Sequence, residues 1–105
     1  LVLIDEDDQK QDIDLLFFSG SGSLGTENSA PSITDANARK YLGKVEVAAA
    51  DYDDLGGVSV VNLNNVGLLL KPDGGTSVYV AAICRSGTPT YTAAGLKLRL
   101  GVIWG

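Results

Sequence analysis

The clearest pattern in the chain is a strict alternation of side-chain type near its end. From Leu96 to Trp104 the sequence reads Leu-Lys-Leu-Arg-Leu-Gly-Val-Ile-Trp, so every second residue is a large apolar one. Side chains of a β-strand point alternately to its two faces, whereas a helix would spread the leucines around its circumference. The pattern therefore predicts a strand over residues 96–104 with one face on a hydrophobic core.

Six further segments are β-branched or alternating and are bounded by turn residues: 1–5, 13–18, 44–47, 58–63, 68–71 and 76–85. Within 44–47, Val45 and Val47 are expected to face inward. The sequence Pro72-Asp73-Gly74-Gly75 favours a turn between the last two segments and predicts a hairpin over residues 68–85. Both faces of residues 76–85 are largely apolar, which is typical of a central strand covered on both sides.

Residues 33–42 are the one segment that favours a helix. Thr34 can cap the first amides, and Gly43 can end the helix in a left-handed conformation. A length of 105 residues fits a single domain over residues 1–105, and 13 glycines indicate many turns between short strands. We expect an all-β fold, an antiparallel β-sandwich of jelly-roll-like type with seven to eight strands and one short helix.

The composition argues against several classes of function. The chain has no His and one Cys, Cys84, which removes His-based triads, imidazole metal sites and an intrachain disulfide. A net charge of −5 disfavours nucleic-acid binding. No apolar run approaches the roughly 20 residues that cross a bilayer, so we expect no membrane partner. The chain begins at Leu1 and contains no Met, and we therefore expect an N-terminal arm to be missing.

Charge is distributed unevenly along the chain. Residues 1–14 carry six carboxylates and one lysine, whereas residues 77–105 carry Arg85, Lys97 and Arg99 and no acid. Opposite patches on identical subunits can meet head to tail, which would make the protein a homo-oligomer. Solvated charge on unrelated loops is the alternative interpretation.

One segment matches a phosphate-binding motif by its letters. Residues 20–25 read Gly-Ser-Gly-Ser-Leu-Gly, the dinucleotide fingerprint, but the polar residues 26–31 that come next show no helical periodicity. That motif needs a helix whose first amides meet the pyrophosphate. A loop is the better interpretation, and we expect no cofactor.

Two carboxylate clusters could hold calcium, residues 5–8 and residues 51–54. Neither has the spacing of an EF-hand loop. Lys10 stands where the first loop needs Gly, and Leu55 and Asn62 stand where the second loop needs stronger oxygen donors. We expect no metal, with Asp51 and Asp53 as the weak candidates for an irregular calcium site. A hydrolase using paired carboxylates is a further alternative, although the chain is short for a substrate cleft.

Several segments, taken in order, resemble small structural proteins of tailed bacteriophages, in particular capsid decoration (cement) proteins. The segments that carry this resemblance are residues 1–5, 14–18, 28–31, 34–36, 41–43, 51–52 and 55–56, then Tyr79, residues 85–91 and the final Leu-rich strand. Proteins of that group carry an additional Gly-rich segment before the opening strand, which this chain lacks.

The resemblance implies a virion protein without enzymatic activity that binds and stabilises capsomers, with the major capsid protein or other virion subunits as partners and assembly in the host cytoplasm. A carbohydrate- or calcium-binding sandwich module of a tail or fibre appendage is the alternative. Candidates for contacts between subunits are Tyr41, Pro89, Tyr91, Arg99 and Trp104.

Overall fold

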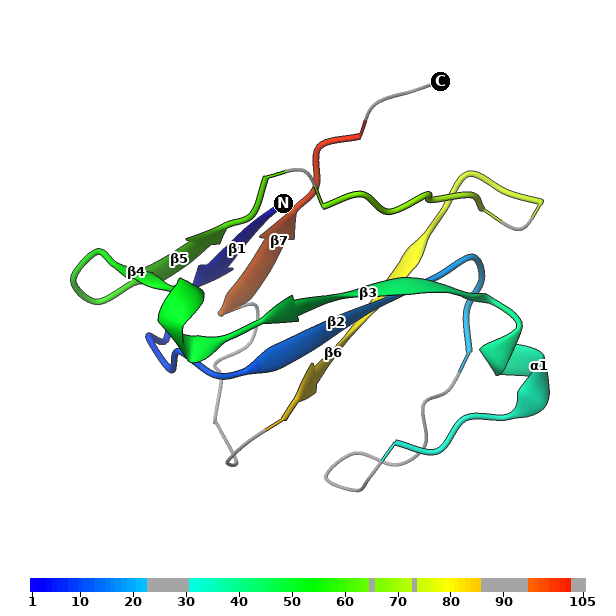
Figure 1. The fold of residues 1–105 in the computed structure, drawn as a ribbon, viewed down its shortest axis with the longest axis horizontal. Helices are drawn as coiled ribbons and strands as arrows, with labels where there is room; N and C mark the ends of the chain where they lie inside the picture. The colour runs from blue at the N-terminus through cyan, green and yellow to red at the C-terminus, as the bar shows by residue number, and fades with distance from the viewer. Residues whose placement is uncertain (23–30, 65, 73, 86–94, 103–105) are drawn as a thin grey trace.

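The chain folds into two antiparallel β-sheets packed as a sandwich, with one short helix and a 3-10 turn (Figure 1). The computed structural model describes residues 1–22, 31–64, 66–72, 74–85 and 95–102. Its strands are β1 (Val2–Asp5), β2 (Ile13–Phe18), β3 (Tyr41–Val47), β4 (Asp53–Asp54), β5 (Ser59–Asn62), β6 (Tyr79–Cys84) and β7 (Leu96–Arg99). Helix α1 spans Asp35–Ala38, and the 3-10 turn η1 spans Ala49–Asp51. The predicted sandwich and its short helix are confirmed.

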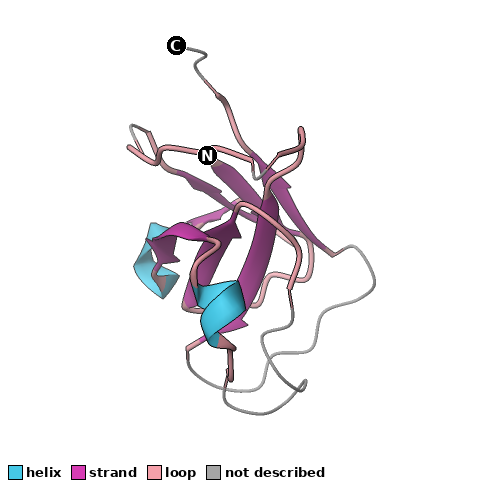
Figure 2. Cartoon of the chain, turned by 90° about the vertical axis from the view of Figure 1, so that its right-hand side faces the viewer, coloured by secondary structure: helices cyan, strands magenta, loops and turns pink. Residues whose placement is uncertain are grey.

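The four-stranded sheet, sheet A, has the order β4-β5-β1-β7, and the three-stranded sheet, sheet B, has the order β3-β2-β6. Figure 1 shows α1 at one end of the molecule, beyond the strands of sheet B, and in Figure 2 this end faces the viewer. Strand β2 pairs with both of its neighbours along its whole length, from Ile13 opposite Val47 and Cys84 to Phe18. It is therefore the central strand of sheet B.

Inward side chains from both sheets form one core. The buried members are Leu3, Ile13, Leu15, Phe17, Val45, Val47, Tyr52 and Val61. The inward orientation predicted for Val45 and Val47 is confirmed. Tyr52 follows η1, and its hydroxyl donates a hydrogen bond of 2.8 Å to the carbonyl of Gln11, so the polar end of this core side chain is satisfied.

The predicted hairpin over residues 68–85 is wrong. Within the described parts of residues 66–78 no strand forms, and this segment connects β5 of sheet A to β6 of sheet B. Leu68 and Leu70 pack against the core while Leu69 is 83% exposed, so the alternation is present without a partner strand. The segment is therefore a crossover between the two layers and not the first strand of a hairpin.

The prediction that residues 76–85 form a central strand is also wrong. Strand β6 lies at the edge of sheet B as the structure describes it, and most of its residues are exposed. Its midpoint is Ala81-Ala82, and alanine adds apolar character to both faces with little side chain to bury. An apolar sequence on both faces therefore did not signify burial here.

Two other predicted elements differ from the structure at their ends. The Thr34 side chain caps α1 as predicted, accepting from the amide of Asn37, but the helix ends at Ala38, and the residues from Tyr41 onward belong to β3. Gly43 does not end the helix. Strand β7 ends at Arg99, whereas the alternation predicted a strand to Trp104, which lies outside the described residues.

A buried carboxylate organises the turn that follows β1. Asp5 has no exposed surface, and its oxygens accept hydrogen bonds from the amides of Asp7, Gln9 and Lys10 at 3.1, 2.8 and 2.9 Å. Asp8 and Lys10 have left-handed φ values of 53° and 52°, which lets the chain curl around the carboxylate. The sequence suggested solvated acids or a calcium loop here. In the structure the Asp5 carboxylate is instead buried at the centre of the loop and accepts hydrogen bonds from the loop amides.

Candidate interaction surface

A β-bulge determines which side chains reach the outer face of sheet B. In the β2–β3 ladder Phe17 lies opposite Gly43, but Phe18 lies opposite Tyr41, so Leu42 is skipped. Gly43 has a φ of 145°, which glycine adopts far more readily than other residues. The bulge turns Leu42 toward the core and brings Tyr41 to the same side as Phe18.

The result is an apolar surface that we call the aromatic face, made of Leu16, Phe18, Ile33, Tyr41 and Tyr79. The rings of Phe18 and Tyr41 lie with centroids 5.8 Å apart at an interplanar angle of 60°, a favourable tilted arrangement. Phe18 is nearly buried beneath this surface, while Ile33, Tyr41 and Tyr79 are 41%, 45% and 45% exposed. Three large apolar side chains therefore meet solvent around one buried ring.

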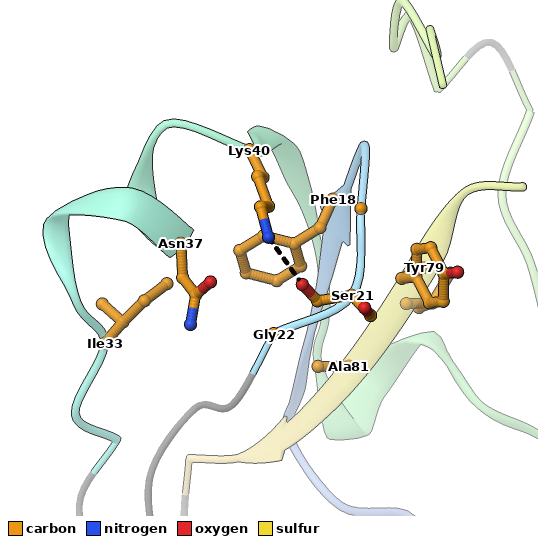
Figure 3. A pocket seen from close by; sticks show the side chains of 10 residues that line it. Phe18, Ser21, Gly22, Ile33, Asn37, Lys40, Tyr79 and Ala81 are labelled. Atoms are coloured by element: carbon orange, nitrogen blue, oxygen red, sulfur yellow. Dashed lines mark hydrogen bonds between the residues drawn. The ribbon is translucent and has the colours of Figure 1, made fainter. Parts of the chain in front are cut away.

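A hollow of about 180 Å³ opens between the α1 segment and β6. Its lining includes Phe18, Ile33 and Tyr79, with the loop of residues 19–22 running past it (Figure 3). Lys40 holds this loop twice, because its carbonyl accepts from the Ser19 amide at 2.8 Å and its Nζ donates to the Ser21 carbonyl at 2.8 Å. The Lys40 ammonium is thus part of the wall of the hollow.

Glycine brings the same loop close to α1. A Cβ atom at Gly22 would lie 2.6 Å from Cγ of Asn37, which is inside van der Waals contact. Gly22 of the fingerprint-like segment thus packs on α1, Gly20 and Ser21 lie against Lys40, and residues 23–25 lie outside the described part. A loop, as predicted, follows β2 over residues 19–22.

A second hollow of about 330 Å³ lies beside the first on the α1 side of the aromatic face. Phe18 and Ile33 line both hollows, and Leu16, Pro31 and Tyr41 complete much of the second one. The two hollows are therefore one apolar, uneven surface rather than separate sites.

Ion pairs occupy the other end of the same outer face. Asp14 lies opposite Glu46 in the β2–β3 ladder, and each acid has a cation beside it. Arg85 Nε lies 2.8 Å from Asp14, and Lys44 Nζ lies 2.8 Å from Glu46. The hydrogen bond between these two side chains lowers the pKa of the Glu46 carboxyl and raises the pKa of the Lys44 ammonium. The face thus runs from an aromatic end to a charged end.

The sequence-predicted contact residues are distributed over both sheets. Tyr41 lies on the aromatic face, while Arg99 is exposed on β7 of sheet A. Pro89, Tyr91 and Trp104 lie outside the described residues. The structure therefore brings Tyr41 together with Phe18 and Tyr79 but does not bring it together with Arg99.

The weak calcium candidates make different contacts. One Asp51 oxygen accepts from the Ala48 amide at 2.8 Å, and Asp53 is exposed on β4. The neighbouring Asp54 accepts from Lys10 Nζ at 3.0 Å, a hydrogen bond that lowers the pKa of Asp54 and raises that of Lys10. Within the described ranges, no three His, Cys, Asp or Glu side chains gather as a metal site requires.

Sequence reasoning missed the role of three residues in the aromatic face. Phe17 and Phe18 are adjacent in a strand, so one of them must point away from the core, and this signal was available for Phe18. Tyr79 was assigned to the covered strand, and Ile33 to the helix. Neither position carries a sequence signal that would place it beside Phe18.

The aromatic face offers contact area and no evident reaction centre. None of the helices that the structure describes has the length and apolar character to span a bilayer. No family model, curated protein or solved structure matches the chain. The geometry of the aromatic face is therefore the main basis for assigning a function.

Proposed function

We propose that this protein is a non-enzymatic virion subunit that binds the surface of another structural protein through its aromatic face. The observation that carries the proposal is the group of exposed Ile33, Tyr41 and Tyr79 side chains around two apolar hollows. Contiguous apolar surface of this kind is uncommon on a free monomer and is typical of sites where proteins meet.

The chemistry of the face suits protein recognition. Tyrosine is enriched at energetic centres of interfaces because its ring supplies contact area while its hydroxyl tolerates water. The hollows can receive side chains of a partner, and the adjacent ion pairs at Asp14 and Glu46 can set orientation. A standard interface covers about 800 Å² per partner, which a face of one small sheet with its flanking loop can approach.

Within this proposal the partner is the major capsid protein, and the role is that of a capsid decoration protein. The resemblance of the chain to such phage proteins supports this assignment, as does a rigid two-layer fold with its binding residues on one side. A decoration protein occupies many equivalent positions on a shell, so it needs a repeated contact surface and no chemistry.

The test is to add purified protein to capsids of the encoding phage that were assembled without it. We expect saturable binding at a fixed ratio of copies to capsomers. Tyr79→Ser should weaken binding at least about tenfold, the effect of removing one aromatic anchor. Tyr41→Ser should weaken binding similarly. Because Tyr41 also contacts Phe18, the melting temperature of this variant is measured to separate lost binding from lost stability.

Leu69→Ser is the matched control, since Leu69 is more exposed than either tyrosine and lines neither hollow. Equal binding by this control and the wild type supports the proposal. Absence of saturable binding to capsids contradicts it. A rise in melting temperature with calcium that Asp53→Ala abolishes would instead favour a calcium-binding appendage module.

A further inference from the structure

Sheet A ends in two strands that each have only one partner in the described structure. Strand β4 pairs only with β5, and β7 pairs only with β1, so these two strands form opposite edges of the sheet (Figure 1). An edge strand presents unpaired backbone N–H and C=O groups that can accept another strand. The side chains on the two edges determine which strand fits.

The outer surface of sheet A changes charge from one edge to the other. One row across the sheet consists of Asp53 on β4, Val60 on β5, Ile4 on β1 and Lys97 on β7, because these residues are successive ladder partners. The row runs from an acid through two apolar residues to a base. Arg99 lies two residues further along β7, on the same face as Lys97.

We propose that β7 of one copy pairs with β4 of a second copy, so that sheet A continues from subunit to subunit. The strand directions permit this, because each neighbouring pair in sheet A is antiparallel and β4 therefore runs opposite to β7. A second copy shifted sideways in the same orientation presents an antiparallel β4 to β7, with outer faces on the same side.

Continuing the row places Lys97 opposite Asp53 of the second copy. Arg99 is then a diagonal neighbour of Asp53, and its long side chain can reach that carboxylate. Two cations of β7 therefore lie around the Asp53 carboxylate of the second copy. Asp53 and Arg99 form no ion pair within the described part of one copy, so both are available.

The pairing strand belongs to a second copy of the protein, because the cationic edge strand β7 and the acidic edge strand β4 both lie on one chain. An interface between different patches of identical subunits repeats, and it closes into a ring or extends as a filament according to the rotation between copies. Strand β4 has only two residues, which limits the contact area and favours weak association in solution. The aromatic face lies on the other sheet, so this inference is independent of the proposed function.

The experiment is sedimentation equilibrium of the full chain over a wide concentration range at low and high salt. We expect concentration-dependent association that weakens as salt screens the charges. Arg99→Glu and Asp53→Arg should each raise the dissociation constant at least about tenfold, because each replaces an attraction by a repulsion. The double variant Arg99→Glu/Asp53→Arg should stay dissociated, because the arginine at position 53 would then lie opposite Lys97 of the neighbouring copy.

A mixture of the two single variants gives the sharpest result. The unaltered β7 of Asp53→Arg matches the unaltered β4 of Arg99→Glu, whereas the opposite interface carries both altered residues, so the mixture should stop at heterodimers. Arg39→Glu makes the same charge change beside α1 and should associate like the wild type. A wild type that stays monomeric throughout, or an Arg99→Glu that associates normally, overturns the inference. Equal loss with Arg39→Glu also overturns it, because net charge would then explain the effect.

Discussion

Asp5→Ala is the substitution that most directly tests how the turn between β1 and β2 is held. The Asp5 carboxylate is completely buried and accepts three backbone hydrogen bonds, from Asp7, Gln9 and Lys10. Two of these amides, those of Gln9 and Lys10, donate to the same oxygen. Alanine would leave all three donors without an acceptor and remove the centre around which the loop curls.

The expected magnitude can be worked out from these contacts. A hydrogen bond to a charged group contributes about 1.5–3 kcal/mol, but loop amides at the surface regain water when the loop relaxes. We therefore expect Asp5→Ala to lower the free energy of unfolding by about 3–5 kcal/mol, a large part of the roughly 5–15 kcal/mol typical of small domains. Asp5→Asn can keep the oxygen that serves Gln9 and Lys10 but turns an NH₂ group toward the Asp7 amide, and should cost about 2 kcal/mol.

Urea denaturation followed by the fluorescence of the single Trp and by circular dichroism measures these differences. The order of stability should be wild type, then Asp5→Asn, then Asp5→Ala, and the asparagine variant keeps the comparison measurable if the alanine variant does not fold. Asp53→Ala is the control, because Asp53 is exposed and should leave stability nearly unchanged. A decrease in the free energy of unfolding below about 1 kcal/mol for Asp5→Ala would refute the reasoning, because losing a carboxylate that accepts three hydrogen bonds should destabilise the protein by more than this.

Three further predictions concern single contacts. Tyr52→Phe removes the hydroxyl that donates to Gln11 and should lower the free energy of unfolding by about 1 kcal/mol in urea, while an unchanged value would contradict that bond. Gly43→Ala must adopt a φ of 145° and place its Cβ 2.7 Å from Leu68 Cδ2, so it should lower the free energy of unfolding by about 2 kcal/mol. In a double-mutant cycle Leu68→Ala should relieve part of that loss, and strictly additive losses would exclude the contact. Burial raises the pKa of the Cys84 thiol, so iodoacetamide should modify Cys84 more slowly than free cysteine at neutral pH, and the rate should increase as the pH rises toward that pKa. A reaction faster than that of free cysteine at neutral pH would contradict the shift.

The periodicity of the sequence was sufficient to predict the two-layer architecture. Residues 13–18 correspond to β2 at both ends. The strand predicted over residues 1–5 begins one residue before β1, and the strand predicted over residues 58–63 extends one residue beyond β5 at each end. Alternation succeeds in these segments because each has one buried face, so that a register shift would expose the whole apolar set. Strand β7 was predicted for the same reason. Its end was not, because the alternation continues to Val102, which is 51% exposed and lies beyond the strand.

Sequence reasoning failed to predict which strands pair with one another. The leucines of residues 68–70 alternate as a strand would, and whether such a segment pairs or crosses between layers depends on contacts distant in the sequence. The position of β6 at an edge depends likewise on which strand β2 accepts as its second neighbour. Local pattern carries information about faces, but the order of strands comes from the packing of the whole chain.

The candidate site was predictable only in part for the same reason. Tyr41 was identified as a contact residue, but its position beside Phe18 depends on the bulge at Gly43, for which the sequence suggested a helix end. Asp5 was recognised as part of an acidic cluster, and its role as an inward residue could have been read from its spacing of two from Leu3. A polar residue at an inward position indicates an internal acceptor more readily than a solvated charge.

The uneven charge of the sequence acquires a different meaning in the fold. Acids of residues 1–14 and bases of residues 77–105 meet within one copy, where Arg85 pairs with Asp14 and Lys97 pairs with Glu6. Arg99 is the cation of this group that makes no such pair among the described residues, and the acid that best matches it lies near β4 instead of near the N-terminus. The segregation of charge along the chain therefore serves first to hold β2 to β6 and the Asp5 loop to β7. Association between copies depends on the unpaired charge at each edge, which is why reversing one residue is expected to weaken it strongly.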